Sequence, residues 1–80
     1  MRLDKYLKVS RLIKRRTVAN SACDAGKILV NDKVARASYE VRPDDVITIM
    51  MGQKPLSVKV ITVAETVKKE DATGLYTVID

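Results

Sequence analysis

The chain has 80 residues, of which 46% are hydrophobic and 31% charged, and its net charge is +5. A chain of this length forms one small domain, here residues 1–80, and hides only about 60% of the surface that its unfolded form exposes. The core is therefore thin, and little room is left for a catalytic cavity. Histidine is absent and Cys23 is the single cysteine, which excludes an internal disulfide and the usual zinc-ligand clusters. We expect neither a metal nor another cofactor.

The start of the chain carries no targeting signal that we can identify. The first residues, Met-Arg-Leu-Asp-Lys, lack the apolar stretch of a secretory signal. No window approaches the roughly 18 uninterrupted apolar residues of a membrane span. We therefore expect a cytoplasmic protein with no membrane partner.

The positive charge is concentrated at one end of the sequence. Residues 1–16 carry seven bases and one acid, a net charge of +6, whereas the other 64 residues carry eight bases and nine acids, a net charge of −1. Basic residues spread evenly over a chain favour solubility and non-specific binding. Basic residues concentrated in one segment form a surface suited to a polyanion.

The first predicted element is an amphipathic helix over residues 2–9. Leu3, Tyr6 and Leu7 repeat at helical spacing, which is typical of a helix that packs one side against a core. Tyr6 could stack on a base, but this spacing favours core packing. The bases on the neighbouring face are Arg2, Lys5 and Lys8.

A second helix is predicted after a short turn. Ser10 and Thr17 are both residue types that favour helix N-caps, so we expect the turn after Ser10 and the helix after Thr17. The helix is expected to run to Ala25, with Gly26 as its stop in the left-handed region. Its expected apolar side consists of Val18, Ala19, Ala22 and Cys23.

Beyond Gly26 the pattern changes from helical to extended. Short apolar or alternating runs predict strands at residues 28–30, 46–50, 56–60 and 76–79, and a short hairpin that returns to Val34. Turn residues separate them at 31–32, 42–45 and 52–55. Residues 65–74 are expected to form a solvated connection or a frayed helical turn. This order predicts an α+β fold, with two helices packed on one face of a small antiparallel β-sheet, and it leaves the strand pairing open.

The basic segment, residues 1–17, has two interpretations. A run of charges on a helix is most often its solvated face. Against this, the segment has one acid for seven bases, so the bases as a group are not laced into acid–base helix pairs at four-residue spacing. Lys14-Arg15-Arg16 also lies beside the N-terminus of the second helix, which attracts anions, and four of the seven bases are arginine. These features favour nucleic acid. RNA is favoured over DNA because no long recognition helix with base-reading side chains is evident.

Other chemically interesting residues have simpler explanations. Cys23 lies on the packing side of a helix and has no histidine to activate it, so we expect a small buried residue. Asp4 is expected to balance the dipole of the first helix or to orient Arg2. Asp44 and Asp45 are turn residues. An enzyme is the least favoured class.

Three stretches together resemble a known family. They are residues 1–7 (Met-Arg-Leu-Asp-Lys-Tyr-Leu), residues 10–17 (Ser-Arg-Leu-Ile-Lys-Arg-Arg-Thr) and residues 26–31 (Gly-Lys-Ile-Leu-Val-Asn). Over about residues 1–50 the chain is similar to the RNA-binding domain of the ribosomal protein S-four type. That resemblance implies a helix-turn-helix that leads into a hairpin and forms an L-shaped RNA-binding surface. One departure is Asn31-Asp32, where many members have Asn-Gly at the hairpin.

The resemblance also implies partners. The chain is similar to stand-alone bacterial members that bind large ribosomal subunits obstructed by peptidyl-tRNA, and residues 51–54 and 75–78 look closer to the quality control branch than to the fifteen-kilodalton heat-shock branch. The implied partners are ribosomal RNA of the large subunit, peptidyl-tRNA and the factor that adds alanine tails to the stalled nascent chain, bound by a monomer. The alternatives are heat-shock-type ribosome recycling, or a protein-docking module that uses the C-terminal sheet edge.

The expected RNA-binding residues come from both arguments. The charge pattern indicates Lys5, Lys8 and Lys14. The resemblance implies Arg2, Ser10, Arg11, Arg15, Arg16 and Thr17, with Lys27 and Asn31 near the hairpin.

Overall fold

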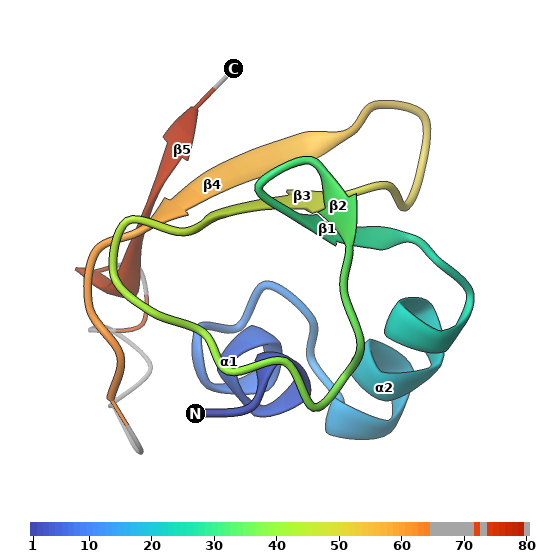
Figure 1. Cartoon of the computed structure of the whole chain (residues 1–80), viewed down its shortest axis with the longest axis horizontal. Helices are drawn as coiled ribbons and strands as arrows, with labels where there is room; N and C mark the ends of the chain where they lie inside the picture. The colour runs from blue at the N-terminus through green and yellow to red at the C-terminus, as the bar shows by residue number, and fades with distance from the viewer. Residues whose placement is uncertain (65–71, 73, 80) are drawn as a thin grey trace.

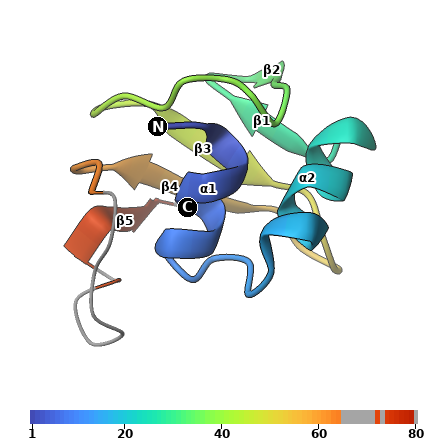
Figure 2. The same ribbon diagram turned by 90° about the horizontal axis from the view of Figure 1, so that it is seen from below.

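The computed structural model describes residues 1–64, 72 and 74–79. Two helices lie on one face of a five-stranded sheet, as Figures 1 and 2 show from two directions. This arrangement confirms the predicted α+β architecture. The elements are α1 (Leu3–Val9), α2 (Arg16–Asp24), β1 (Ile28–Val30), β2 (Lys33–Val34), β3 (Val46–Ile49), β4 (Leu56–Val60) and β5 (Tyr76–Ile79).

The sheet is antiparallel throughout, with the strand order β2-β1-β3-β4-β5. The register places Ile47 of β3 opposite Val30 of β1 and Val58 of β4. Because side chains alternate between the faces of a strand, this row points to one side of the sheet, and all three side chains are buried. The core therefore lies between this face and the helices.

Helix α1 supplies the largest core residues. Leu3, Tyr6 and Leu7 are fully buried, as their spacing predicted. The Tyr6 hydroxyl donates a hydrogen bond of 2.8 Å to the carbonyl oxygen of Leu75 and so connects α1 to the segment before β5. Burial raises the pKa of Tyr6 to about 12, so the hydroxyl keeps its proton and remains a donor. The strand residues that are fully buried with them are Ile28, Ile47, Val58 and Val60.

Helix α2 differs from its prediction at both ends and on one side. It ends at Asp24, one residue before the expected Ala25. It begins at Arg16, with Arg15 at the N-cap position, so Thr17 lies in the first turn and is not the cap. Ala19, Ala22 and Cys23 are buried as expected, but Val18 is 42% exposed. Successive helical residues are about 100° apart, and Val18 is rotated by that angle from Ala19 and away from the sheet.

The two helices end in similar ways on different residues. After α2, Gly26 has φ 74° and donates to the Cys23 carbonyl, while Lys27 donates to the Ala22 carbonyl. These two bonds form a Schellman motif, and Gly26 is the predicted stop. After α1, Ser10 is the C-cap residue, and Arg11, with φ 62°, occupies the left-handed position. Ser10 therefore ends α1, and the predicted turn follows it.

The turns and the strand ends are resolved as well. Asn31 and Asp32 both have positive φ, 53° and 69°, so the β1–β2 hairpin closes with a type I′ turn. The second position of such a turn, here Asp32, is usually glycine. Strand β3 ends at Ile49, and Met50 is 50% exposed. The expected strand to residue 50 is thus one residue too long. Of the expected connection 65–74, only residues 72 and 74 lie within the described part of the chain.

Within the described residues, neither helix is both long and apolar enough to cross a bilayer.

Candidate nucleic-acid interface

Most of the predicted RNA-binding side chains reach solvent. Lys5 is half-buried, and Ser10 is buried. The Ser10 hydroxyl lies 3.3 Å from the Leu7 carbonyl oxygen, to which it donates a hydrogen bond. Ser10 therefore secures the end of α1, and its side chain is not offered to a ligand. The predicted residues that are exposed are Arg2, Lys8, Arg11, Lys14, Arg15, Arg16, Thr17, Lys27 and Asn31.

A buried carboxylate organises part of the basic segment. Asp4 is 2% exposed, on the side of α1 that faces α2. Its Oδ1 lies 3.2 Å from Arg2 Nε, and its Oδ2 lies 3.4 Å from Arg16 Nε. Asn20 Nδ2 donates to Oδ2 at 3.2 Å. One carboxylate thus holds two guanidinium groups, one from the N-cap residue of α1 and one from α2, and leaves a net positive charge at the surface.

This cluster confirms that Asp4 orients Arg2, and it adds Arg16 as a second partner that the sequence did not indicate. Arg16 is twelve residues from Asp4, beyond any helical spacing, and the packing of α2 against α1 brings them together. Burial by itself raises the pKa of Asp4, but the hydrogen bonds from Asn20, Arg16 and Arg2 outweigh it and hold this pKa below its ordinary value. The carboxylate is therefore ionised at neutral pH.

The N-termini of the two helices have different surroundings. At α1, the backbone N–H groups of Leu3 and Asp4 donate to the carbonyl oxygens of Tyr39 and Ala37, at 2.7 and 3.2 Å. At α2, no described side chain caps the N-terminus, and its first turn contains no acid. Free N–H groups and the helix dipole make such an end attractive to an anion.

The turn between the helices presents further cations. Ile13 is buried, and its N–H donates to the Leu7 carbonyl, which fixes the turn to α1. Arg11, Lys14 and Arg15 are exposed around this anchor. Arg11 takes the left-handed conformation that costs a non-glycine residue about 1 kcal/mol. Exposed cations therefore lie in the turn that leads into the open N-terminus of α2.

The two residues near the hairpin have unequal roles. Asn31 Oδ1 accepts from the backbone N–H of Val46 at 3.0 Å, and Asn31 Nδ2 donates to Asp45 at 3.1 Å. The Asn31 side chain therefore braces the hairpin against the turn before β3. Lys27 follows α2 at the surface, and its side chain is exposed.

Cys23 has the structural character that the sequence predicted. It is 3% exposed, and burial, together with the charges of Asp4 and Asp24, raises the pKa of its thiol to about 11. A protonated, buried thiol is a poor nucleophile. The described residues do not bring three His, Cys, Asp or Glu side chains together at any metal-binding distance.

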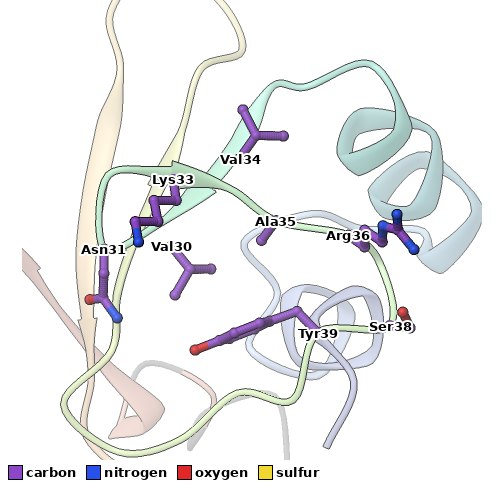
Figure 3. A pocket seen from close by; sticks show the side chains of 8 residues that line it. All are labelled: Val30, Asn31, Lys33, Val34, Ala35, Arg36, Ser38 and Tyr39. Atoms are coloured by element: carbon purple, nitrogen blue, oxygen red, sulfur yellow. The ribbon is translucent and has the colours of Figure 1, made fainter.

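A hollow of about 570 Å³ beside the hairpin was not predicted from the sequence. Lys33, Arg36 and Tyr39 line it, and Figure 3 shows the Tyr39 ring across it with Val30 nearby. In the sequence, the charge was summed over all of residues 17–80, so Lys33 and Arg36 were cancelled by acids that lie elsewhere in the fold. The available signal was local, since no acid occurs between Lys33 and Tyr39.

Comparison with known proteins shows the family to which the chain belongs. The model of the S4 domain family matches residues 1–47. The chain is 51% identical to the RQC P-site tRNA stabilizing factor of Bacillus subtilis, over 99% of this chain and 92% of that protein. It is 54% identical to the protein of the same name from Halalkalibacterium halodurans, over 98% of this chain and 89% of that protein.

A solved structure has the same fold. Heat Shock Protein 15 of Vibrio cholerae, described as trimeric, superposes with a TM-score of 0.92 at 26% sequence identity. The match covers 99% of this chain and 81% of that one. The agreement extends beyond the two helices to the whole sheet.

Proposed function

Because the chain belongs to the S4 domain family and to its group of RQC P-site tRNA stabilizing factors, we propose that it is an RNA-binding factor of ribosome-associated quality control. It binds tRNA in the P site and ribosomal RNA on large subunits obstructed by peptidyl-tRNA. It thereby supports the partner that adds alanine tails to the stalled chain. Its contribution is binding rather than catalysis.

The observation that carries this proposal is the basic segment around the N-terminus of α2. Arg15 and Lys14 are exposed there, Arg16 is fixed by Asp4, and the helix end lacks a capping side chain among the described residues. A phosphate at this point accepts hydrogen bonds from backbone N–H groups and from the arginine guanidinium groups, and the helix dipole stabilises its negative charge. Phosphate and shape contacts are the usual mode for structured RNA.

The test is the joint replacement of Arg15 and Arg16 by alanine. We expect the variant to lose most of its affinity for stalled large subunits in a co-sedimentation assay. Because Arg16 also contacts Asp4, circular dichroism must show that the variant is folded. Arg15→Ala alone leaves the Asp4 cluster intact and should give a partial loss. Unchanged affinity of the folded double variant would refute the mechanism.

Lys59→Gln is a matched control for charge. Lys59 is an exposed cation of β4, remote from the basic segment in sequence, and its partner Asp44 is itself exposed. Removing it lowers the net charge by one, as Arg15→Ala does. We expect it to leave binding unchanged, whereas a loss equal to that of Arg15→Ala would show that only total charge matters.

Salt dependence gives a second test of phosphate binding. About five neutralised phosphates give a slope of log affinity against log salt on the order of −3 to −4. We expect such a slope for tRNA in a filter-binding assay. A flat line would contradict binding through phosphates.

A second candidate, docking of a protein partner, has one observation in its favour. Strand β5 is an edge of the sheet, and Val78 and Leu56 near it are 54% and 37% exposed. Free edges can pair with a partner strand. Crosslinking in cells distinguishes the two, because RNA adducts within residues 1–31 support the first and protein adducts beyond residue 55 support the second.

A further inference from the structure

The hollow beside the hairpin has the size and lining of a ligand site. Its volume of about 570 Å³ is within the range of roughly 300–1,000 Å³ that is typical of small-molecule sites. Val30 and the ring of Tyr39 provide apolar walls, and Lys33 and Arg36 are cations at its border. None of its lining residues is acidic. A ligand that fits this lining combines a flat apolar surface with negative charge.

The aromatic wall is held in place before any ligand arrives. The Tyr39 hydroxyl donates to Asp45 Oδ2 at 2.9 Å, and the Tyr39 carbonyl accepts from the N–H of Leu3 at 2.7 Å. Asp45 in turn accepts from the backbone N–H of Arg42 and from the side chain of Asn31. Both ends of the tyrosine are thus restrained, and a fixed ring loses little conformational freedom when a ligand stacks on it.

The hollow is continuous with the basic segment. A second hollow, of about 450 Å³, shares Val34, Ala35, Arg36 and Ser38 with the first and is also lined by Arg2. Arg2 belongs to the Asp4 cluster, and Figure 3 shows Arg36 on the side of the first hollow that is nearer to α2. A nucleic-acid strand on the basic segment therefore has a path past Arg36 to Tyr39, along which Arg2, Arg36 and Lys33 outnumber the one lining acid, Asp24.

We propose that the hairpin hollow binds an unpaired nucleotide of the RNA, with its base against the Tyr39 ring and its phosphates beside Lys33 and Arg36. Stacking on an aromatic side chain is a common way to hold unpaired bases, because every base has a π-face. This inference rests on the proposed RNA-binding function and adds to it a site outside the basic segment.

The experiment compares two fluorescent probes by anisotropy: a single-stranded octamer of uridine, and an abasic octamer with the same ribose-phosphate backbone. We expect the protein to bind the uridine octamer at least about fivefold more tightly, because a stacked base contributes roughly 1–3 kcal/mol. Tyr39→Leu should remove this preference and leave the affinity for the abasic octamer unchanged. Tyr39→Phe keeps the ring, loses only the hydroxyl bond to Asp45, and should keep the preference.

The outcomes separate this site from the proposed function. If the protein binds both octamers equally and with a steep salt dependence, the hollow is not a base site while the RNA-binding function stands. If neither octamer nor tRNA binds in a salt-dependent way, the RNA-binding function itself fails. Arg15→Ala should weaken both octamers by the same factor.

A second measurement covers the case in which Tyr39→Leu does not fold. Lys33 and Arg36 are exposed, so Lys33→Gln with Arg36→Gln removes two cations without disturbing the core. We expect this double variant to make the salt slope shallower by about 1.4, since each phosphate on a single strand contributes about 0.7. A photoreactive 5-bromouridine octamer should crosslink to Tyr39 or its neighbours in the hollow. Adducts confined to residues 1–17 would overturn the proposal.

Discussion

Two groups of cations within the basic segment are held in different ways. Arg2 and Arg16 share the buried carboxylate of Asp4, whereas Arg11, Lys14 and Arg15 have no acidic partner among the described residues. The fixed pair has already lost its side-chain freedom on folding, so it offers a defined geometry to a ligand. The group without an acidic partner, Arg11, Lys14 and Arg15, is less restrained and acts mainly through its charge. Arg2 and Arg16 thus provide a defined geometry for a ligand, whereas Arg11, Lys14 and Arg15 mainly provide positive charge.

Removing the carboxylate should have the largest effect on this contrast. Asp4→Asn leaves two guanidinium groups around a buried amide, and we expect a loss of about 2 kcal/mol in unfolding free energy, less than for a fully buried pair because both arginines are half-exposed. Urea denaturation at pH 7 measures it. Because the hydrogen-bonded Asp4 has a lowered pKa, its contribution is present above the ordinary value of 3.8 and is lost as pH falls through the folded value.

The same variant gives a control at low pH. Below the folded pKa the wild-type Asp4 is protonated, so wild type and Asp4→Asn should approach equal stability. A stability difference that stays the same at every pH down to the acid unfolding of the protein would show that the charge of Asp4 does not contribute to the packing of the two helices.

Lysine replacements distinguish the cations that Asp4 holds from those without an acidic partner, while they conserve charge. Arg16→Lys loses the planar fork that reaches both carboxylate oxygens, and we expect a cost of about 1 kcal/mol in unfolding free energy and weaker tRNA binding. Arg15→Lys should change stability by less than about 0.5 kcal/mol. Equal effects of the two replacements on stability would remove the distinction.

Arg11 separates stability from binding in the opposite direction. Its φ of 62° suits glycine, so we expect Arg11→Gly to stabilise the protein by up to about 1 kcal/mol in thermal or urea unfolding. The same variant should bind tRNA less tightly, with a shallower salt slope. A variant that is less stable than wild type would indicate that the arginine side chain supports the turn.

The smallest effect is expected on the sheet. Lys59 Nζ lies 3.8 Å from Asp44 Oδ1, and the Asp44 side chain is 86% exposed. Exposed pairs of this kind contribute about 0–1 kcal/mol, so Lys59→Gln should change the unfolding free energy by less than about 0.5 kcal/mol. A larger loss in urea unfolding would reveal a role of β4 that charge and exposure do not predict.

The sequence was sufficient for features that depend on neighbouring residues. Helical spacing identified Leu3, Tyr6 and Leu7 as core, short apolar or alternating runs identified the strands, and Gly26 marked the end of α2. The motifs within residues 1–31 were enough to indicate the family to which the chain belongs. Periodicity, turn residues and short motifs are local properties, which is why these predictions held.

Other features of the fold depended on how the helices and the sheet pack against one another. The sequence misassigned Thr17 as a cap and Val18 as core, because the start and the buried side of a nine-residue helix are set by its packing against α1 and the sheet. The sequence by itself determined the two helices, the antiparallel strands and the basic end of the chain. Only the tertiary structure decided that Asp4 holds Arg16 and that Tyr39 and Lys33 line one hollow, because these contacts join residues that no local pattern relates.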